Sequence, residues 1–175
     1  MDSKIEMYYS EEERENVWNV RTDGTHIKAV SNYLLEDGIA REGIDRIVAT
    51  AAYGLGLCPN PADCTSRKET GLVIGKVQSG KTSSFIALTA LAFDNGYNLV
   101  VVLGGTKKKL LKQNSDRIKE YFHQCKDVCT LDTKTNADIA NSQEILKFIR
   151  QGKKIIVVGL SLIHISEPTR PRLIS

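Results

Sequence analysis

The sequence predicts an α/β fold, in which strands and helices alternate to form a parallel sheet, preceded by an N-terminal helical region. From Leu72 onward, short apolar runs of strand length alternate with helix-length segments, which is the pattern of a parallel sheet with right-handed crossovers. A glycine-rich loop lies between the first of these runs and the first of these helices. Residues 1–56 instead space their apolar residues as helices do.

The composition sets broad limits on the kind of protein. The chain has 175 residues, enough for one domain or a domain and a half, and 41% of them are hydrophobic. A net charge of +3 by itself indicates neither a nucleic-acid nor a membrane partner. There is no apolar run of about 18 residues, and the polar start Met1 to Lys4 is unlike a signal peptide. We therefore expect a cytoplasmic protein without a membrane partner.

The four cysteines do not predict a disulfide framework or a zinc site. They are Cys58, Cys64, Cys125 and Cys129. Disulfides are rare in cytosolic chains, and neither C-x₅-C nor C-x₃-C is the usual C-x₂-C spacing of zinc pairs. We expect reduced, partly buried thiols.

Three helices are predicted in the N-terminal region. Ser10 followed by acids forms a capping box, which predicts a helix over Glu11 to Val20. Apolar residues at helical spacing predict two more, over His26 to Glu36 and over Ile39 to Tyr53. We interpret Gly54-Leu55-Gly56 as a helix stop, and residues 57–70, rich in proline and polar residues, as a linker. His26 is a lone histidine, for which a surface position or a satisfied structural role is favoured over metal ligation.

The stretch with the clearest chemistry is Gly75-Lys76-Val77-Gln78-Ser79-Gly80-Lys81-Thr82, which fits G-x-x-x-x-G-K-[ST]. Its glycines allow backbone conformations that a Cβ would block, so loop amides can point at phosphate oxygens. A helix beginning near Gly80 adds the positive end of its dipole. Lys81 is expected to reach the β- and γ-phosphates, and the Thr82 hydroxyl to bind Mg²⁺. The residues expected at ATP are Gly75, Gln78, Ser79, Gly80, Lys81, Thr82 and Ser83.

The flanking residues support this motif. Leu72 to Ile74 is a short apolar run of the kind that a buried parallel strand gives. Ser83 to Phe93 is long enough for a helix, mostly apolar, and free of glycine and proline. Asp94-Asn95-Gly96 predicts the end of that helix. Leu99 to Leu103 is a second buried strand, and the ligand site of an open α/β sheet lies at the carboxyl ends of its strands.

The next predicted helix runs from Lys107 to Phe122 and begins with three consecutive lysines. Lys107, Lys108 and Lys109 crowd the positive end of the helix dipole, which costs a few tenths of a kcal/mol or more per charge. An anion such as a nucleic-acid backbone would compensate for this crowding. Three solvated lysines with screened repulsion explain the pattern equally well.

A phosphate loop normally works with an acid at the end of another strand. Lys154 to Val158 is a clear strand, but Gly159 follows it. Asp132 follows the less apolar Val128 to Leu131 and is a weak candidate, because Cys129 and Thr130 interrupt the run. Ile139 to Gln151 is a predicted helix between these strands. The sequence therefore predicts nucleotide binding with poor hydrolysis, and it nominates no charge-stabilising arginine.

The last residues differ in character from the rest. Leu160 to Arg170 resembles the conceptual translation of a transposase-type sequencing-library adapter. Foreign tails are left out of fold arguments, so Leu160 to Ser175, including His164, contributes to no site. The native gene is then expected to continue beyond about Gly159, which makes this chain a fragment. A genuine C-terminal tail is the alternative.

The loop Gly75 to Thr82 resembles the G-x-V-Q-S-G-K-T loop of the helicase-like ATPases in bacterial endonucleases that carry the so-called Z-one domain. Gly96-Tyr97 and the strand Val100 to Leu103 extend the similarity. So does the stretch that contains Gly105, Thr106, Leu110, Gln113 and Arg117. That stretch is also similar to motif Ia of superfamily-two helicases, which contacts the nucleic-acid backbone.

The resemblance covers about Leu72 to Val158. It implies a truncated RecA-like lobe over residues 71–159, with ATP and Mg²⁺ as ligands, DNA as partner at Thr106 and Lys107 to Lys109, and a role in restriction or phage defence. The acidic helicase motif, a second lobe and a nuclease domain are absent, and no glutamine upstream of Gln78 reads adenine. Two alternatives are a nucleotide-binding regulatory module without motor activity and a small-molecule kinase. The lysine cluster favours the DNA-acting protein.

Overall fold

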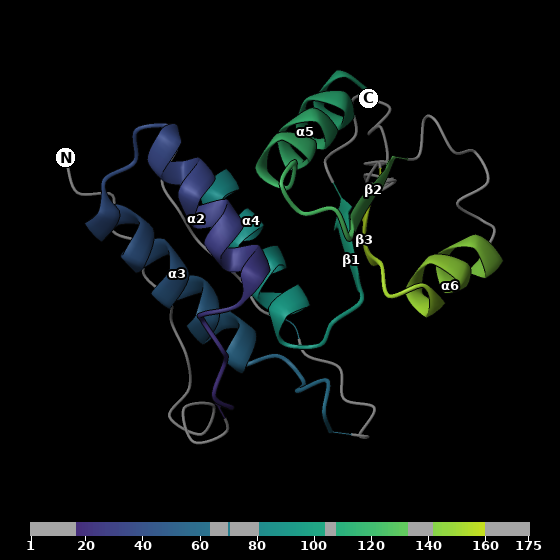
Figure 1. Ribbon diagram of the computed structural model, residues 1–175, viewed down its shortest axis with the longest axis horizontal. Coiled ribbons are helices and arrows are strands. Elements are labelled where there is room, and N and C mark those ends of the chain that lie inside the picture. Colours follow the sequence, from purple (N-terminus) through teal and green to yellow (C-terminus); the bar gives the residue numbers. More distant parts are fainter. Residues whose placement is uncertain (1–16, 64–69, 71–80, 104–107, 133–141, 160–175) are drawn as a thin grey trace, which may run out of the picture.

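The computed structural model describes residues 17–63, 70, 81–103, 108–132 and 142–159. They form helices α2 (Thr25–Glu36), α3 (Arg41–Gly56), α4 (Lys81–Asp94), α5 (Lys108–Tyr121) and α6 (Ser142–Arg150), and strands β1 (Leu99–Leu103), β2 (Val128–Asp132) and β3 (Lys154–Gly159). Figure 1 shows α2, α3 and α4 side by side as one helical layer, with the sheet beside it. The described residues thus combine helices with a small open parallel sheet, as an α/β fold requires.

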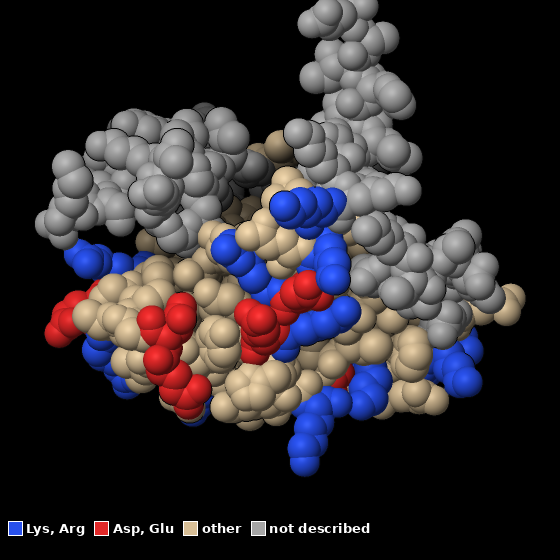
Figure 2. Space-filling view, turned by 90° about the horizontal axis from the view of Figure 1, so that it is seen from above, with Lys and Arg blue, Asp and Glu red and all other residues tan. Residues whose placement is uncertain are grey.

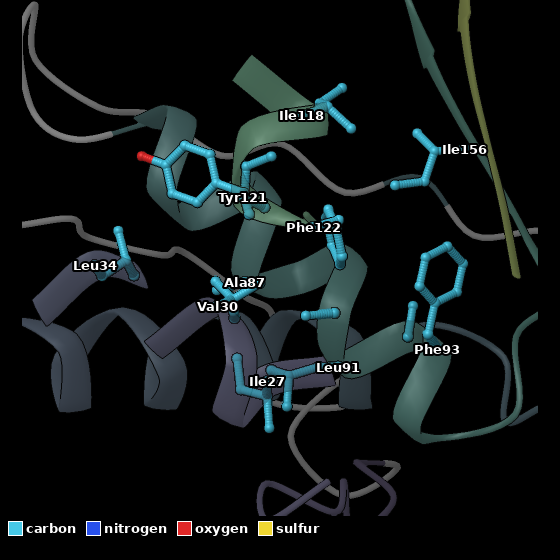
Figure 3. Packing of buried hydrophobic residues seen from close by; sticks show 14 of the residues in the cluster. Ile27, Val30, Leu34, Ala87, Leu91, Phe93, Ile118, Tyr121, Phe122 and Ile156 are labelled. Atoms are coloured by element: carbon cyan, nitrogen blue, oxygen red, sulfur yellow. The ribbon is translucent and has the colours of Figure 1, made fainter. Parts of the chain in front are cut away.

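Helix α4 is the element against which the N-terminal helices pack. Both α2 and α3 contact it along its length, and its sequence has a charged residue only at each end. Such a helix is apolar around most of its circumference, which is typical of a helix buried on several sides. Ile27 and Leu34 of α2 belong to the same buried cluster as Ala87 and Leu91 of α4 (Figure 3).

The sheet has the strand order β1-β3-β2, and both pairs are parallel. Helix α5 connects β1 to β2, and α6 connects β2 back to β3. These two connections run across the sheet in opposite directions, so two right-handed crossovers must place their helices on opposite faces. Figure 1 shows α5 and α6 on opposite sides of the strands.

The two faces of β3 are buried differently. Ile156 and Val158 join the core formed with α4 and α5, in which the rings of Phe93 and Phe122 lie 6.1 Å apart, edge to face. Ile155 and Val157 alternate with them, are also buried, and lie on the face turned to α6. One core therefore joins the helical layer to the sheet.

Most predicted elements are confirmed. Helices α2 and α3 match the segments predicted over His26 to Glu36 and Ile39 to Tyr53, and α5 matches Lys107 to Phe122 where the structure describes it. Helix α4 begins at Lys81, near the predicted start at Gly80. It ends as predicted before Gly96, which has a φ of +101°, a conformation that favours glycine.

One prediction about the N-terminal region is wrong. Val17 to Val20 is not helical. It crosses the end of α3, where the Trp18 amide donates to the Gly56 carbonyl at 3.3 Å and its indole Nε1 donates to the Cys58 carbonyl at 2.8 Å. The helix stop predicted at Gly54-Leu55-Gly56 is confirmed, because α3 ends at Gly56, slightly beyond the predicted Tyr53. A Cβ at Gly56 would lie 2.6 Å from a methyl group of Val17, so this glycine makes room for the crossing segment.

Several predicted segments lie outside the described residues. They are Glu11 to Asn16, most of the linker, the strand Leu72 to Ile74, the loop residues Gly75 to Gly80, Gly104 to Lys107, and the tail Leu160 to Ser175.

Candidate functional site

The described part of the candidate nucleotide site is the start of α4. Lys81 and Thr82 form its first turn directly after the loop Gly75 to Gly80, which lies outside the described residues. Thr82 is half-buried and Ser83 is buried, with 7% of its surface exposed. Helix α4 runs opposite in direction to β1 (Figure 1), so its N-terminus lies toward the carboxyl ends of the strands. This is the end of the sheet at which α/β proteins bind ligands.

Three strands end at this edge. In the parallel register, Leu103 of β1 lies opposite Gly159 of β3, and Asp132 of β2 lies opposite Val158 of β3. The weakly apolar run Val128 to Leu131 is therefore a strand after all, and it ends in an acid. Cys129 and Thr130 make this run less hydrophobic than the other strands. It forms a strand nevertheless, because its backbone pairs with β3.

The lysine cluster lies at the start of α5, the helix that follows the carboxyl end of β1 in the chain. Thr106 and Lys107 lie outside the described residues, Lys108 is the first residue of the helix, and Lys109 is exposed. The first turn of α5 contains no acid. The predicted accumulation of positive charge at a helix N-terminus is therefore present for Lys108 and Lys109.

The exposed face of α5 carries both signs of charge. A shallow depression along the helix is lined by Lys109, Lys112, Gln113, Asp116, Arg117 and Glu120. Figure 2, seen from above, shows basic and acidic side chains interleaved on the face turned to the viewer. Lys109 and Lys112 lie in the first half of the helix, whereas Asp116 and Glu120 lie in the second half together with Arg117. The first-turn lysines and these acids are placed against the helix dipole, and Lys119 in the last turn is placed as the dipole favours.

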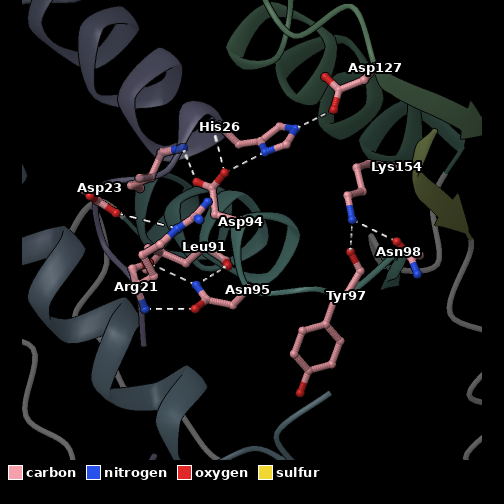
Figure 4. Close-up of polar contacts among 11 residues, drawn as sticks. Arg21, Asp23, His26, Leu91, Asp94, Asn95, Tyr97, Asn98, Asp127 and Lys154 are labelled. Atoms are coloured by element: carbon pink, nitrogen blue, oxygen red, sulfur yellow. Dashed lines mark hydrogen bonds and ion pairs between the residues drawn. The ribbon is translucent and has the colours of Figure 1, made fainter. Parts of the chain in front are cut away.

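A polar cluster joins the C-terminal end of α4 to the start of α2. Asp94, the last residue of α4, accepts hydrogen bonds from the backbone amides of His26 at 3.1 Å and Ile27 at 2.9 Å. These amides are in the first turn of α2, where no intrahelical acceptor exists. The residue at the N-cap itself, Gly24, has no side chain to offer. The carboxylate of one helix therefore caps another helix (Figure 4).

Gly24 is required by the space that this carboxylate occupies. A Cβ at Gly24 would lie 2.0 Å from the carboxyl carbon of Asp94. The φ of Gly24 is −70°, a value that any residue adopts, so close approach is the reason for glycine here.

The His26 ring completes the cluster. Its Nδ1 lies 2.8 Å from Oδ1 of Asp94, and its Nε2 lies 2.9 Å from Oδ2 of Asp127, in the connection between α5 and β2. The side chain of Asp94 is 1% exposed and that of Asp127 is 49% exposed. His26 is thus a buried, satisfied structural histidine, which is one of the two roles that the sequence favours, but its two partners are not evident from the sequence.

Both buried groups have shifted pKa values. The hydrogen bond to Asp94 raises the pKa of His26 above its usual 6.5, against the opposing effect of burial, and the hydrogen bond to Asp127 adds to the increase. Burial acts to raise the pKa of Asp94, but the hydrogen bonds from the His26 ring and from the amides of Ile27 and His26 outweigh it. The pKa of Asp94 is held below its usual 3.8.

Two further polar contacts tie the layers together at this end of α4. The Asn95 side chain accepts from the Arg21 amide at 2.8 Å and donates to the Arg21 carbonyl at 2.9 Å. Lys154 of β3 donates to the Tyr97 carbonyl at 3.0 Å and to the Asn98 side chain at 2.8 Å. The segment before α2, the end of α4 and the start of β3 are therefore fastened at one place (Figure 4).

Within the ranges that the structure describes, no group of three or more histidine, cysteine or acidic side chains is arranged to bind a metal ion. Cys58, Cys125 and Cys129 form no disulfide with one another, and Cys64 lies outside those ranges. None of the described helices is long and apolar enough to cross a membrane.

Comparison with known proteins adds no relative. No protein-family model matches the chain, and neither a curated protein nor a solved structure matches it.

Proposed function

We propose that this chain is the ATP-binding part of a helicase-like ATPase that acts on DNA, with a RecA-like first lobe. Gly75, Gly80, Lys81 and Thr82 bind the phosphates and Mg²⁺ in this proposal. The observation that supports it is the position of a G-x-V-Q-S-G-K-T sequence directly before α4, a helix that begins at the carboxyl edge of a parallel sheet. Loop amides and a helix dipole then act together on the same anion.

The residues at that edge have distinct roles in the proposal. Lys81 neutralises charge on the β- and γ-phosphates, and the Thr82 hydroxyl is a ligand of Mg²⁺. Asp132 is the acid that the described strand ends offer at this edge. An acid in that place holds Mg²⁺ through water and orients the attacking water.

DNA is the proposed partner of the α5 N-terminus. Thr106 and Lys107 to Lys109 contact phosphates, whose negative charge offsets the repulsion between the lysines and the positive helix end. The expected readout is a strong dependence of binding on salt concentration.

A second candidate is a nucleotide-binding regulatory module without motor activity. The observation that favours it is the interleaving of acids with cations along α5. Asp116 and Glu120 would oppose a phosphate backbone that followed the whole helix. Binding of nucleotide without any binding of DNA would select this candidate.

Nucleotide binding is tested by thermal unfolding of the intact chain with and without MgATP. At a concentration of about 100 times Kd, a ligand stabilises the folded state by about 2.7 kcal/mol. This raises Tm by about 5–10 °C in a domain of this size. Lys81→Ala should abolish the increase.

Lys28→Ala is the matched control, because it also removes one lysine but from the exposed surface of α2. It should retain the full increase. An equal increase in wild type and Lys81→Ala would remove the phosphate loop from the proposal.

A further inference from the structure

The His26 ring lies between two groups that can only accept hydrogen bonds. Ionised carboxylates have no proton to donate, and Asp94 and Asp127 lie within 2.9 Å of the two ring nitrogens. A neutral imidazole has one N–H and one lone pair. It would therefore direct a lone pair at one carboxylate oxygen. Only the doubly protonated ring satisfies both contacts.

We propose that His26 is an imidazolium cation, and that the triad Asp94–His26–Asp127 is a proton-controlled contact that holds the N-terminal helices against the sheet. Its three members come from the start of α2, the end of α4 and the connection that leads into β2. Asp94 lies 68 residues and Asp127 lies 101 residues from His26 in sequence. The triad therefore joins three parts of the chain that no local interaction connects.

The two contacts of the ring respond differently to loss of a proton. Asp94 is buried and also accepts from two backbone amides, so it stays in place and keeps the hydrogen on Nδ1. Asp127 is half-exposed and can rotate its carboxylate into water at little cost in solvation. Deprotonation at Nε2 thus opens the Asp127 contact and leaves the Asp94 contact closed.

The surroundings of the ring, in the part of the chain that the structure describes, offer no other group that would replace the lost contact. From α4, the Phe93 ring packs edge to face against the imidazole, with the two ring centroids 5.7 Å apart. From the α5–β2 connection, Cys125 is a thiol whose pKa is raised to about 11 by burial and by Asp127 and Asp94, so it stays neutral. From β3, Lys154 is occupied by Tyr97 and Asn98.

The direction of the pH effect follows from the raised pKa of His26. A group whose pKa is higher in the folded than in the unfolded chain binds its proton more tightly when folded. Its contribution to stability is complete below the unfolded pKa of about 6.5. The contribution is lost as pH rises through the higher pKa of the folded protein. The lowered pKa of Asp94 acts at acidic pH, where the contribution of this carboxylate to stability is lost as pH falls below about 3.8.

The first test is an NMR titration of the histidine ring nitrogens in the intact, ¹⁵N-labelled chain, from about pH 5.5 to about pH 9, a range that spans the ordinary histidine pKa of about 6.5. Both ring nitrogens of His26 should carry protons at about pH 6.5, and the midpoint should lie above that pH, with Nε2 losing its proton. A midpoint at or below about 6.5 overturns the proposal. This test needs no variant, so a variant that fails to fold does not affect it.

The second test uses Asp127→Asn, which removes the charge but keeps the shape. It should lower the His26 midpoint and flatten the decline of Tm above about pH 6.5. Docking of α2 on α5 is measured independently of Tm. The measurement is the NMR contact between the rings of Tyr33 and Tyr121, whose centroids lie 4.6 Å apart. In wild type this contact should weaken at high pH, and in Asp127→Asn it should not change with pH.

His123→Gln is the control for histidine titration, because His123 is exposed and its Nδ1 lies 2.8 Å from the backbone carbonyl of Glu120 rather than from a carboxylate. Its ring also lies 6.0 Å from that of Tyr33, so the pH dependence of Tm, and not its absolute value, should match that of the wild type. If His26 titrates above about pH 6.5 while Tm and the Tyr33–Tyr121 contact stay constant, the triad does not control docking and that part of the proposal is rejected.

Discussion

Asp94 and Gly24 show how single residues determine the join between two helices. The Asp94 carboxylate takes the place of an N-cap side chain for α2, although it lies 68 residues from His26 in sequence. Gly24 leaves the volume that this carboxylate fills. A local capping residue would make α2 an independent helix, whereas this arrangement makes its first turn depend on α4.

We expect Gly24→Ala to destabilise the protein by at least about 2 kcal/mol, because the new methyl group and the Asp94 carboxylate cannot occupy the same space and the cap is lost. The measurement is urea unfolding followed by circular dichroism.

Gly43→Ala is the control. Gly43 lies in the first turn of α3, and the nearest atom to its added Cβ is the Cγ2 methyl of Ile39 at 3.3 Å, which must move by only a few tenths of an ångström. It should change stability by less than about 1 kcal/mol in either direction. Equal effects at both positions would show that close approach is not the reason for glycine at residue 24.

At the scale of an element, several charges of α5 are placed against the helix dipole. Lys108 and Lys109 occupy the positive end, and Asp116 and Glu120 lie toward the negative end, where Lys119 partly offsets them. Each misplaced charge costs about 0.3–1 kcal/mol when exposed. The helix forms nevertheless, because Leu111, Ile118 and Tyr121 are buried on its other face. Packing therefore outweighs the electrostatic cost, and the surface charges are free to serve binding.

Replacing Lys107, Lys108 and Lys109 with glutamine should reduce the salt dependence of DNA binding. If all three contact phosphates, the slope of log K against log salt should fall by about 2.7, since each neutralised phosphate contributes about 0.9. The slope is measured by fluorescence anisotropy with a labelled duplex. Stability should not decrease, because repulsion at the helix start is relieved.

The control for this change removes three exposed lysines from other elements: Lys28, Lys126 and Lys147. It produces the same loss of net charge. An identical slope in both triple variants would mean that net charge alone, and not the start of α5, governs binding to DNA.

At the scale of the whole molecule, α4 is both the helix that follows the phosphate loop and the centre of the core. It contacts α2 and α3, and its residues share one buried cluster with β3 and α5. Figure 3 shows Leu91 beside Ile27 of α2, and Phe93 turned toward Ile156 of the sheet. A change anywhere in this cluster is therefore expected to affect the packing of α4 against both the N-terminal helices and the sheet.

Leu91→Ala should destabilise the whole protein by about 2–5 kcal/mol, because Leu91 is fully buried and the change leaves a cavity. Unfolding in urea should remain a single transition when it is followed by helix content and by Trp18 fluorescence. Leu103→Ala is the control, because that leucine is 64% exposed, and it should cost less than about 0.5 kcal/mol. Separate transitions in the two signals would show that the N-terminal region, which Trp18 reports at the end of α3, does not unfold together with the remaining helices.

Local patterns in the sequence account for most elements. Helical spacing of apolar residues predicted α2 and α3, and Gly96 predicted the end of α4. The run Leu99 to Leu103 predicted the strand β1 but not its burial, because Leu99, Val101 and Leu103 are exposed on one face. The capping-box argument for Glu11 to Val20 failed over Val17 to Val20, because Trp18 bonds to the end of α3 instead of continuing a helix. Hydrophobicity alone also undervalued β2, whose backbone pairs with β3.

Local patterns were enough to predict the α/β alternation and the G-x-x-x-x-G-K-T motif before α4, because spacing, turn residues and glycines act over a few neighbouring residues. The nucleotide and DNA roles stay predictions. Three features are evident from the folded chain alone: Asp94 caps α2, His26 lies between two carboxylates, and Asp132 ends a strand at the carboxyl edge. Each of these depends on residues far apart in the chain, whose approach is set by the packing of α4 against the N-terminal helices and by strand pairing in the sheet.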